Sequence, residues 1–184
     1  MSKTIPVFER LQFSDKEAVI KNALLMSTLL TQAYYSIQGH QDTLTMPDGR
    51  MPIQFRREGL TNLHFEVFCR ILEPLKRVDL THEEYVLLKT LMLCNPAVKE
   101  VSERARKILE KEFERYSKIL LKHVQGNLGT APGAVKYAKI MEVFEAMAHF
   151  AQKHRELHVW VQMQFGIIFR NKKIHIRVLD EVLG

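Results

Sequence analysis

The stretch from residue 6 to residue 21, PVFERLQFSDKEAVIK, constrains the fold more than any other part of the chain. Pro6 lacks a backbone N–H and disfavours helical geometry in the residue before it, so a helix arriving from the N-terminus must stop here. Ser14 and Glu17 have the spacing of a capping box, which predicts a second helix beginning at Asp15. The apolar side chains expected to hold this corner together are Phe8, Leu11 and Phe13.

Eight positions of this corner follow the pattern Pro-x-Phe-x-x-Leu-x-x-x-Asp-Lys-x-x-Val-Ile-Lys. They are Pro6, Phe8, Leu11, Asp15, Lys16, Val19, Ile20 and Lys21. The pattern resembles the signature of nuclear receptor ligand-binding domains, with a lysine where glutamine is commoner. Later segments occur in the same order as in that family, and their sequences are most similar to those of its nematode branch. The resemblance implies an all-α fold, a layered antiparallel helical sandwich with one small β-hairpin.

The spacing of apolar residues predicts helices along nearly the whole chain. Thr81 with Glu84, and Ser102, have the pattern of helix N-caps. Residues 42–55, on either side of an Asp48-Gly49 turn, are the one segment that predicts strands, paired as a hairpin. Residues 126–133 are rich in glycine and proline and predict a loop. The expected helices span residues 15–37, 60–76, 82–94, 103–124, 134–169 and 178–183.

The 184 residues suit a single domain, and the resemblance implies that residues 1–184 form part of a ligand-binding domain. The usual domain is longer at its front, so its early helices and the zinc-finger DNA-binding domain are expected to be absent. Cys69 and Cys94 lie in apolar helical patterns, which favours buried, reduced thiols over a disulfide framework or a zinc module.

The net charge of +6 raises the question of nucleic-acid binding. The basic residues are spread along amphipathic helices among 21 acidic ones, and the densest run, residues 170–177, is short. A solvated surface is therefore favoured over a nucleic-acid groove, and we expect no direct DNA binding. No apolar run approaches the length that a membrane span requires, so no membrane association is expected.

The tail hexamer, residues 178–183, fits the family's activation helix. Such a helix completes a groove for a Leu-x-x-Leu-Leu helix of a coregulator, whose unpaired end groups suit a lysine at one end and a carboxylate at the other. The resemblance assigns these two roles to Lys3 and Glu181. The other residues that it places at this coregulator site are Phe13, Lys16, Ile20, Lys21 and Leu179. The alternative is that the lysines and the tail are simply solvated.

The resemblance also implies a wall for a small lipophilic ligand on the central helix. Its residues are Leu25, Thr28, Leu29, Gln32 and Tyr35, with residues 43–45 nearby. Many family members carry an arginine at the Tyr35 position, and here no charge is available. For Leu25 and Leu29 the alternative is ordinary core packing.

The predicted helix 134–169 is so long that it indicates either a kink or a face buried against a partner. The partner expected in the second case is another receptor, in a homodimer or heterodimer. In that case Ala146, Phe150 and Leu157 are expected on one outward stripe. A truncated dimerisation module that binds no ligand is therefore the alternative function, and a small-ligand carrier is a third.

His154 and His158 share a helix face and have a metal-ligand spacing, but Glu156 projects elsewhere. We therefore expect histidines at the surface or facing a partner, and no metal, no cofactor and no enzymatic activity. The resemblance implies a regulator of transcription in the nucleus.

Overall fold

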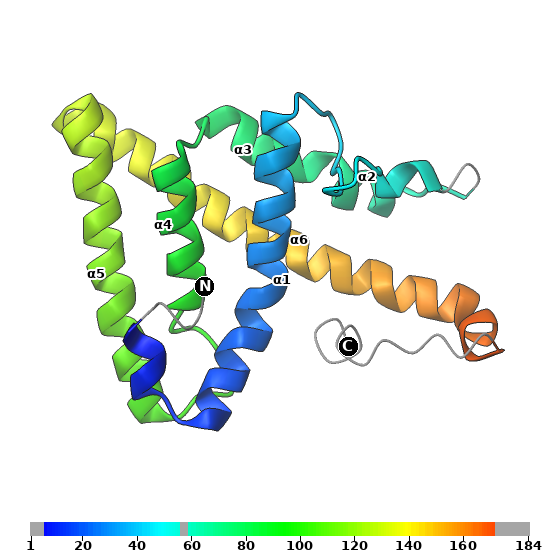
Figure 1. The fold of residues 1–184 in the computed structure, drawn as a ribbon, viewed down its shortest axis with the longest axis horizontal. Helices are drawn as coiled ribbons and strands as arrows, with labels where there is room; N and C mark the ends of the chain where they lie inside the picture. The colour runs from blue at the N-terminus through cyan, green and yellow to red at the C-terminus, as the bar shows by residue number, and fades with distance from the viewer. Residues whose placement is uncertain (1–5, 56–58, 172–184) are drawn as a thin grey trace. The chain divides into compact units, whose positions relative to one another are not determined.

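The computed structural model describes residues 6–55 and 59–171, and all regular secondary structure in these ranges is helical. The all-α prediction is confirmed. The elements, of which the α-helices are labelled in Figure 1, are η2 (Pro6–Arg10), α1 (Phe13–Gln38), η3 (Pro52–Phe55), α2 (Asn62–Phe68), η4 (Arg70–Leu72), α3 (Glu73–Val78), α4 (His82–Leu93), α5 (Glu103–Leu128) and α6 (Thr130–Asn171).

These elements form two compact units, and α1 and α6 contribute to both. The first unit contains the chain up to residue 27 and residues 78–145. The second contains residues 28–77 and the chain from residue 146 onward. Each unit is described separately below.

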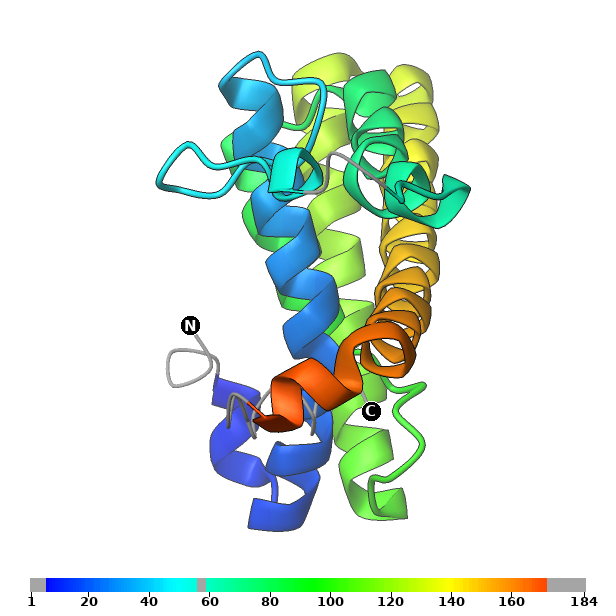
Figure 2. The ribbon, with the colours of Figure 1, turned by 90° about the vertical axis from the view of Figure 1, so that its right-hand side faces the viewer.

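In the first unit, η2 lies beside the first turns of α1 (Figures 1 and 2). A continuous apolar core joins these two elements to the end of α4 and the start of α5. Fully burying a large apolar side chain such as Val, Leu, Ile or Phe contributes about 1.5–3 kcal/mol. The members of this core are Val7, Phe8, Leu11, Ala18, Val19, Ala23, Leu93, Cys94, Val98, Val101, Ala105, Ile108 and Leu109.

The N-terminus of α1 differs from the prediction. The helix begins at Phe13, because the amide of Lys16 donates to the carbonyl of Gln12 at 3.0 Å. Ser14 therefore lies inside the first turn, and the Glu17 carboxylate instead pairs with Lys21 at 2.9 Å. The capping box predicted at Ser14 is wrong.

The C-terminus of α1 lies one residue from its predicted position, at Gln38. His40 has a φ of 55°, and its amide donates to the carbonyl of Ile37 at 2.9 Å. The next amide, of Gln41, donates to the carbonyl of Ser36 at 2.9 Å. This pair of bonds is a Schellman motif, so His40 rather than the neighbouring glycine takes the left-handed conformation that ends the helix.

The caps predicted for α4 and α5 are confirmed. The Thr81 hydroxyl accepts from the amide of Glu84 at 3.3 Å, and the amide of Thr81 donates to the Glu84 carboxylate at 2.9 Å. That carboxylate is buried and also pairs with Lys136 of α6 at 2.9 Å. In the same unit the Ser102 hydroxyl accepts from the amide of Ala105 at 3.2 Å.

The loop predicted at residues 126–133 is reduced to a single residue, Gly129, between α5 and α6. Gly129 has a φ of 89°, which a residue with a side chain rarely adopts. Gly133 allows the two helices to approach closely, since a Cβ there would lie 2.5 Å from the Cα of Gln125. Glycine is thus required to form the sharp turn, and both flanking helices continue up to it.

In the second unit, the hairpin predicted at residues 42–55 does not form. A tight turn is present, with the amide of Met46 donating to the carbonyl of Arg50 at 2.7 Å, but η3 begins at Pro52 and no strand follows. Before the turn, the amide of Leu44 donates to the carbonyl of Phe68 at 2.7 Å. These backbone groups are satisfied by α2 instead of by a partner strand.

The helix predicted at residues 60–76 is present as three short pieces, α2, η4 and α3. The interruption lies at Cys69, whose φ of −114° is outside the usual helical range. Val67, Ile71 and Leu72 are nonetheless buried, so the predicted apolar face is correct although the helix is not continuous.

Candidate functional site

The residues predicted at the coregulator site that the structure describes lie on the first turns of α1. Phe13 is 82% exposed and Ile20 is 39% exposed, with Lys16 half-buried between them. Steps of three and four residues put these side chains on one face of the helix. Leu24, one turn further, is 40% exposed and extends the same face. We call Phe13, Lys16, Ile20 and Leu24 the α1 face.

Lys21 lies at the border of the α1 face and is half-buried, paired with Glu17. Lys3, Leu179 and Glu181, the remaining predicted residues of the site, lie outside the described part of the chain.

The opposite side of α1 is anchored by a buried carboxylate. Asp15 is 4% exposed, and its two oxygens accept from the amide of Ser102 at 2.8 Å and from the Ser102 hydroxyl at 2.9 Å. Because Ser102 also caps α5, one carboxylate connects the N-termini of two helices 87 residues apart. Charge-assisted bonds of this kind are short and strong, so they fix how α1 presents its exposed face.

The five residues predicted to face a ligand occupy one side of α1 but differ in exposure. Leu25 and Leu29 are 9% and 2% exposed, which suits either a cavity wall or a packed core. Tyr35 is 56% exposed, with its ring edge against Tyr34, and Thr28 is also exposed. Gln32 is half-buried, and its amide nitrogen lies 3.4 Å from the sulfur of Met46.

Residues 43–45 lie against the second half of α1, as the sequence predicted. The amide of Thr45 donates to the Ser36 hydroxyl at 2.9 Å, and that hydroxyl donates to the carbonyl of Gln32 at 2.7 Å. This bridge connects the turn to the part of the helix that carries Gln32.

The stripe predicted on α6 for pairing with another receptor is wrong in its residues. Phe150 and Leu157 are 6% and 7% exposed, so they are core side chains, and Ala146 is half-buried. Among the described side chains of this part of α6, the large apolar ones that are exposed are instead Val159, at 51%, and Met163, at 80%.

Two histidines of α6, His149 and His154, lie against α2 in the second unit. The ring of His154 meets Phe68 edge-on at 5.9 Å, and its Nδ1 lies 3.1 Å from the carbonyl oxygen of Phe150. Burial lowers the pKa of His154 to about 4, so the imidazole is neutral in the folded chain. His149 lies 3.6 Å from the Glu66 carboxylate, and Glu156 pairs with Lys153 at 2.8 Å.

In the part of the chain that the structure describes, no three His, Cys, Asp or Glu side chains are grouped to hold a metal ion. None of the helices described there combines the length and apolar character that a membrane crossing demands.

In the first unit, Asp15 anchors the corner formed by η2, α1 and α5, and α1 carries an exposed apolar face. The chain belongs to the nuclear hormone receptor family, since the model for the ligand-binding domain of nuclear hormone receptor matches residues 1–164. The resemblance seen in the corner motif is thereby confirmed. Members of this family are in general regulators of transcription and not enzymes.

Similar proteins come from Caenorhabditis elegans. Nuclear hormone receptor family member nhr-60 is 27% identical over 182 residues, which cover 99% of this chain and 39% of that protein. Family member nhr-136 is 27% identical over 161 residues, covering 86% of this chain and 37% of that protein. Nuclear hormone receptor 114 is 26% identical over 164 residues, covering 87% and 39%. The chain thus spans about two fifths of the length of these relatives.

Proposed function

We propose that this chain regulates transcription in the nucleus by binding a Leu-x-x-Leu-Leu helix of coregulator proteins on the α1 face. The observation that supports the proposal is the row of exposed apolar side chains, Phe13, Ile20 and Leu24, on a helix anchored from its other side by Asp15. An amphipathic helix binds in such a place by burying its apolar positions, three and four residues apart, against it.

Charges at the rim complete the proposed site. A short bound helix has positive partial charge at its N-terminus and negative partial charge at its C-terminus. In this proposal Glu181 receives the first end and Lys3 the second, and Leu179 adds apolar contact. Lys16 lies within the α1 face and Lys21 at its border, where both favour the carboxyl end of the bound helix or acidic residues beside it.

Fluorescence anisotropy with a labelled Leu-x-x-Leu-Leu peptide tests the proposal. Ile20→Asp puts a charge in the middle of the apolar row, so we expect the peptide affinity to fall at least about tenfold. Val86 of α4 is 38% exposed, almost the same as Ile20, so Val86→Asp is the matched control and should bind as wild type does. Equal binding by wild type and Ile20→Asp would refute the α1 face as the site.

The same assay tests the clamp. Glu181→Gln keeps the shape of the side chain but removes its charge, which is worth about 1.5–3 kcal/mol in a charge-assisted bond, so affinity should fall about ten- to a hundredfold. Lys3→Ala should have a smaller effect, because an exposed lysine contributes about 0–1 kcal/mol. If Glu181→Gln binds the peptide as tightly as wild type, the tail hexamer is not an activation helix.

We also propose that a small lipophilic ligand contacts α1 at Leu25, Thr28, Leu29, Gln32 and Tyr35 and controls coregulator binding. Of the three less exposed residues, Leu25, Leu29 and Gln32, Gln32 is the one with a polar side chain. Passing the purified chain over a lipophilic resin and repeating the anisotropy measurement tests this. The molecules that the resin removes are then eluted and added back to the chain. If the peptide affinity is the same before the resin, after it and after this addition, the interaction module that needs no ligand is favoured.

Pairing with a second receptor is the other candidate, and the exposed residues Val159 and Met163 favour it. Val159→Glu should then lower the fraction of dimer in analytical ultracentrifugation. Val135 is 58% exposed, close to the 51% of Val159, and Val135→Glu is the control. Equal sedimentation of both variants and wild type would exclude Val159 from a dimer contact.

A further inference from the structure

We infer that the outer face of α5 is a docking surface for an acidic helical segment of a partner protein. Six basic residues follow one another along this helix at steps of three, four, four, three and four residues. At 3.6 residues per turn these steps keep all six within an arc of about 80°, along about 27 Å of helix. They are Arg104, Lys107, Lys111, Arg115, Lys118 and Lys122, and we call them the basic stripe.

All six side chains of the basic stripe are exposed. Arg115 pairs with Glu112 at 3.4 Å, and Lys118 pairs with Glu114. For the other four, no ion pair forms with any residue that the structure describes. Like charges three and four residues apart on a helix repel one another, and the ion pairs of Arg115 and Lys118 offset only part of this repulsion within the stripe. A row of carboxylates laid along it would turn that repulsion into attraction.

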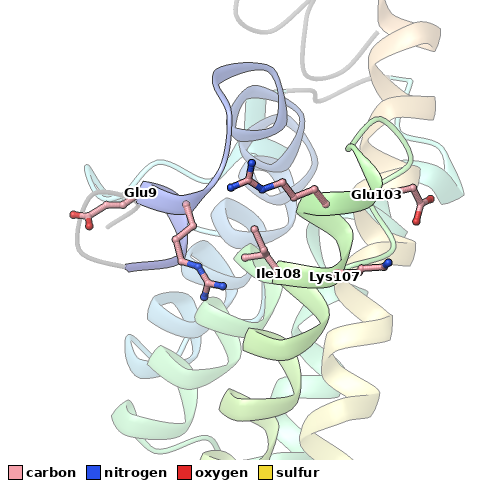
Figure 3. A pocket seen from close by; sticks show the side chains of 6 residues that line it. Glu9, Glu103, Lys107 and Ile108 are labelled. Carbon is pink, nitrogen blue, oxygen red and sulfur yellow. The ribbon is translucent and has the colours of Figure 1, made fainter.

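A hollow of about 620 Å³ lies at the N-terminal end of the basic stripe, between η2 and α5 (Figure 3). Its lining residues are Glu9, Arg10, Glu103, Arg104, Lys107 and Ile108. The figure shows the side chains of Glu9 and Glu103 pointing away from each other on opposite sides, with Ile108 between them. Because Arg10 is paired with Glu112 at 3.6 Å, the hollow offers the cations of Arg104 and Lys107 and the apolar side chain of Ile108 to the end of a bound segment.

The pattern of charge beside the stripe favours a protein partner over a nucleic acid. Glu103, Glu110 and Glu114 form a parallel acidic row on the same helix, displaced by about 80° from the centre of the stripe. A duplex carries phosphates on both strands, and a duplex laid on the stripe would also bring them against this acidic row. A helix with a single narrow acidic row avoids the repulsion.

A second copy of the chain fits the stripe poorly. Two copies of α5 facing each other would set six cations of one against three carboxylates of the acidic row of the other. The excess of like charge across such an interface is unfavourable. The partner must therefore bring more acidic residues than this helix has.

Two synthetic peptides of the same composition test the inference by isothermal titration with the whole 184-residue chain. The striped peptide is an alanine-rich helix with six Glu residues at steps of four, three, four, four and three, the antiparallel complement of the basic stripe. The scrambled peptide distributes the same six Glu residues around the helix. We expect the striped peptide to bind about tenfold more tightly, with an affinity that falls as salt is added.

A pair of matched variants locates the surface. Lys107→Glu with Lys111→Glu reverses the middle of the stripe, and Lys99→Glu with Lys139→Glu reverses two exposed lysines elsewhere for the same change in net charge. We expect the first variant to lose about tenfold or more in affinity for the striped peptide and the second to lose less than about threefold. Lys107→Gln with Lys111→Gln, which adds no new repulsion, should lie between them, and circular dichroism verifies that each variant is folded.

Several outcomes would overturn the inference. If both peptides bind equally, the attraction depends on net charge alone. If neither binds, the stripe is a solvated surface. If an unrelated DNA duplex, or a vesicle of phosphatidylcholine and phosphatidylserine, binds more tightly than the striped peptide and is sensitive to the Lys107 and Lys111 changes, the surface serves a nucleic acid or a membrane instead.

Discussion

The bond between Asp15 and Ser102 predicts an unusually large cost for a single hydroxyl. The Ser102 hydroxyl accepts from the amide of Ala105, so its loss in Ser102→Ala costs about 1 kcal/mol as a helix cap. It also donates to the buried Asp15 carboxylate at 2.9 Å, a charged bond whose loss costs about 1.5–3 kcal/mol. We therefore expect Ser102→Ala to lower the free energy of unfolding by about 2.5–4 kcal/mol.

Thr81→Ala is the matched control, because the Thr81 hydroxyl also caps a helix but bonds no buried carboxylate outside its own helix. It should cost about 1 kcal/mol. Urea unfolding followed by circular dichroism measures both, with Asp15→Asn and the double variant with Ser102→Ala closing a cycle whose coupling energy isolates the bond. Equal losses for Ser102→Ala and Thr81→Ala, or a coupling energy near zero, would refute the idea that Asp15 anchors α1 to α5.

Three further predictions concern other parts of the chain. Burial lowers the pKa of His154 to about 4 from 6.5, so below pH 6.5 the unfolded chain binds the proton first. As the pH is lowered from about 6.5 to about 4, the free energy of unfolding measured in urea titrations should fall by about 3 kcal/mol. His154→Gln should flatten this pH dependence. Gly133→Ala should cost about 1–3 kcal/mol in thermal unfolding because its Cβ meets α5, whereas Gly126→Ala, with open space around it, should gain about 0.5–1 kcal/mol. Burial raises the pKa of the Cys94 thiol to about 12, so Ellman's reagent near neutral pH should label only Cys69 in the folded chain and both thiols in denaturant.

The sequence predicted helix ends well where the end depends on neighbouring residues alone. Thr81 with Glu84, and Ser102 with Ala105, form their caps across three residues, so nothing distant is needed to recognise them. The same pattern at Ser14 failed because the first turn of α1 is positioned by a residue 87 positions away, Ser102, through Asp15. A contact at that separation leaves no local pattern.

The hairpin at residues 42–55 failed for a related reason. The turn chemistry at Asp48 was sufficient to predict a turn, which forms. Whether the flanking residues pair as strands depends on whether another acceptor competes for their amides. The carbonyl of Phe68 is that acceptor, and it takes the amide of Leu44 and the hydroxyl of Thr43.

Exposure was the least predictable property of the candidate sites. An apolar residue on a helix can face a core or a partner, and the periodicity is the same in both cases. Leu24 shares the apolar periodicity of the buried residues of α1 but is exposed, whereas Leu157 was expected on an outward stripe but is buried. The spacing of the six basic residues of α5 is present in the sequence. Because basic residues are spread over many helices of the chain, this one row is hard to recognise from the sequence alone.

The corner motif shows how one short pattern determines both a core and a surface. Val19 is fully buried and Ile20, the next residue, is 39% exposed, because consecutive residues on a helix point about 100° apart. If the exposed side is kept for a partner, the two positions should respond differently to the same change. Val19→Asp should prevent stable folding because it buries a charge, whereas Ile20→Asp should lower the free energy of unfolding by no more than about 1–2 kcal/mol while lowering the peptide affinity at least about tenfold. A loss of several kcal/mol in Ile20→Asp would mean that Ile20 belongs to the core, and the α1 face would lose its central residue.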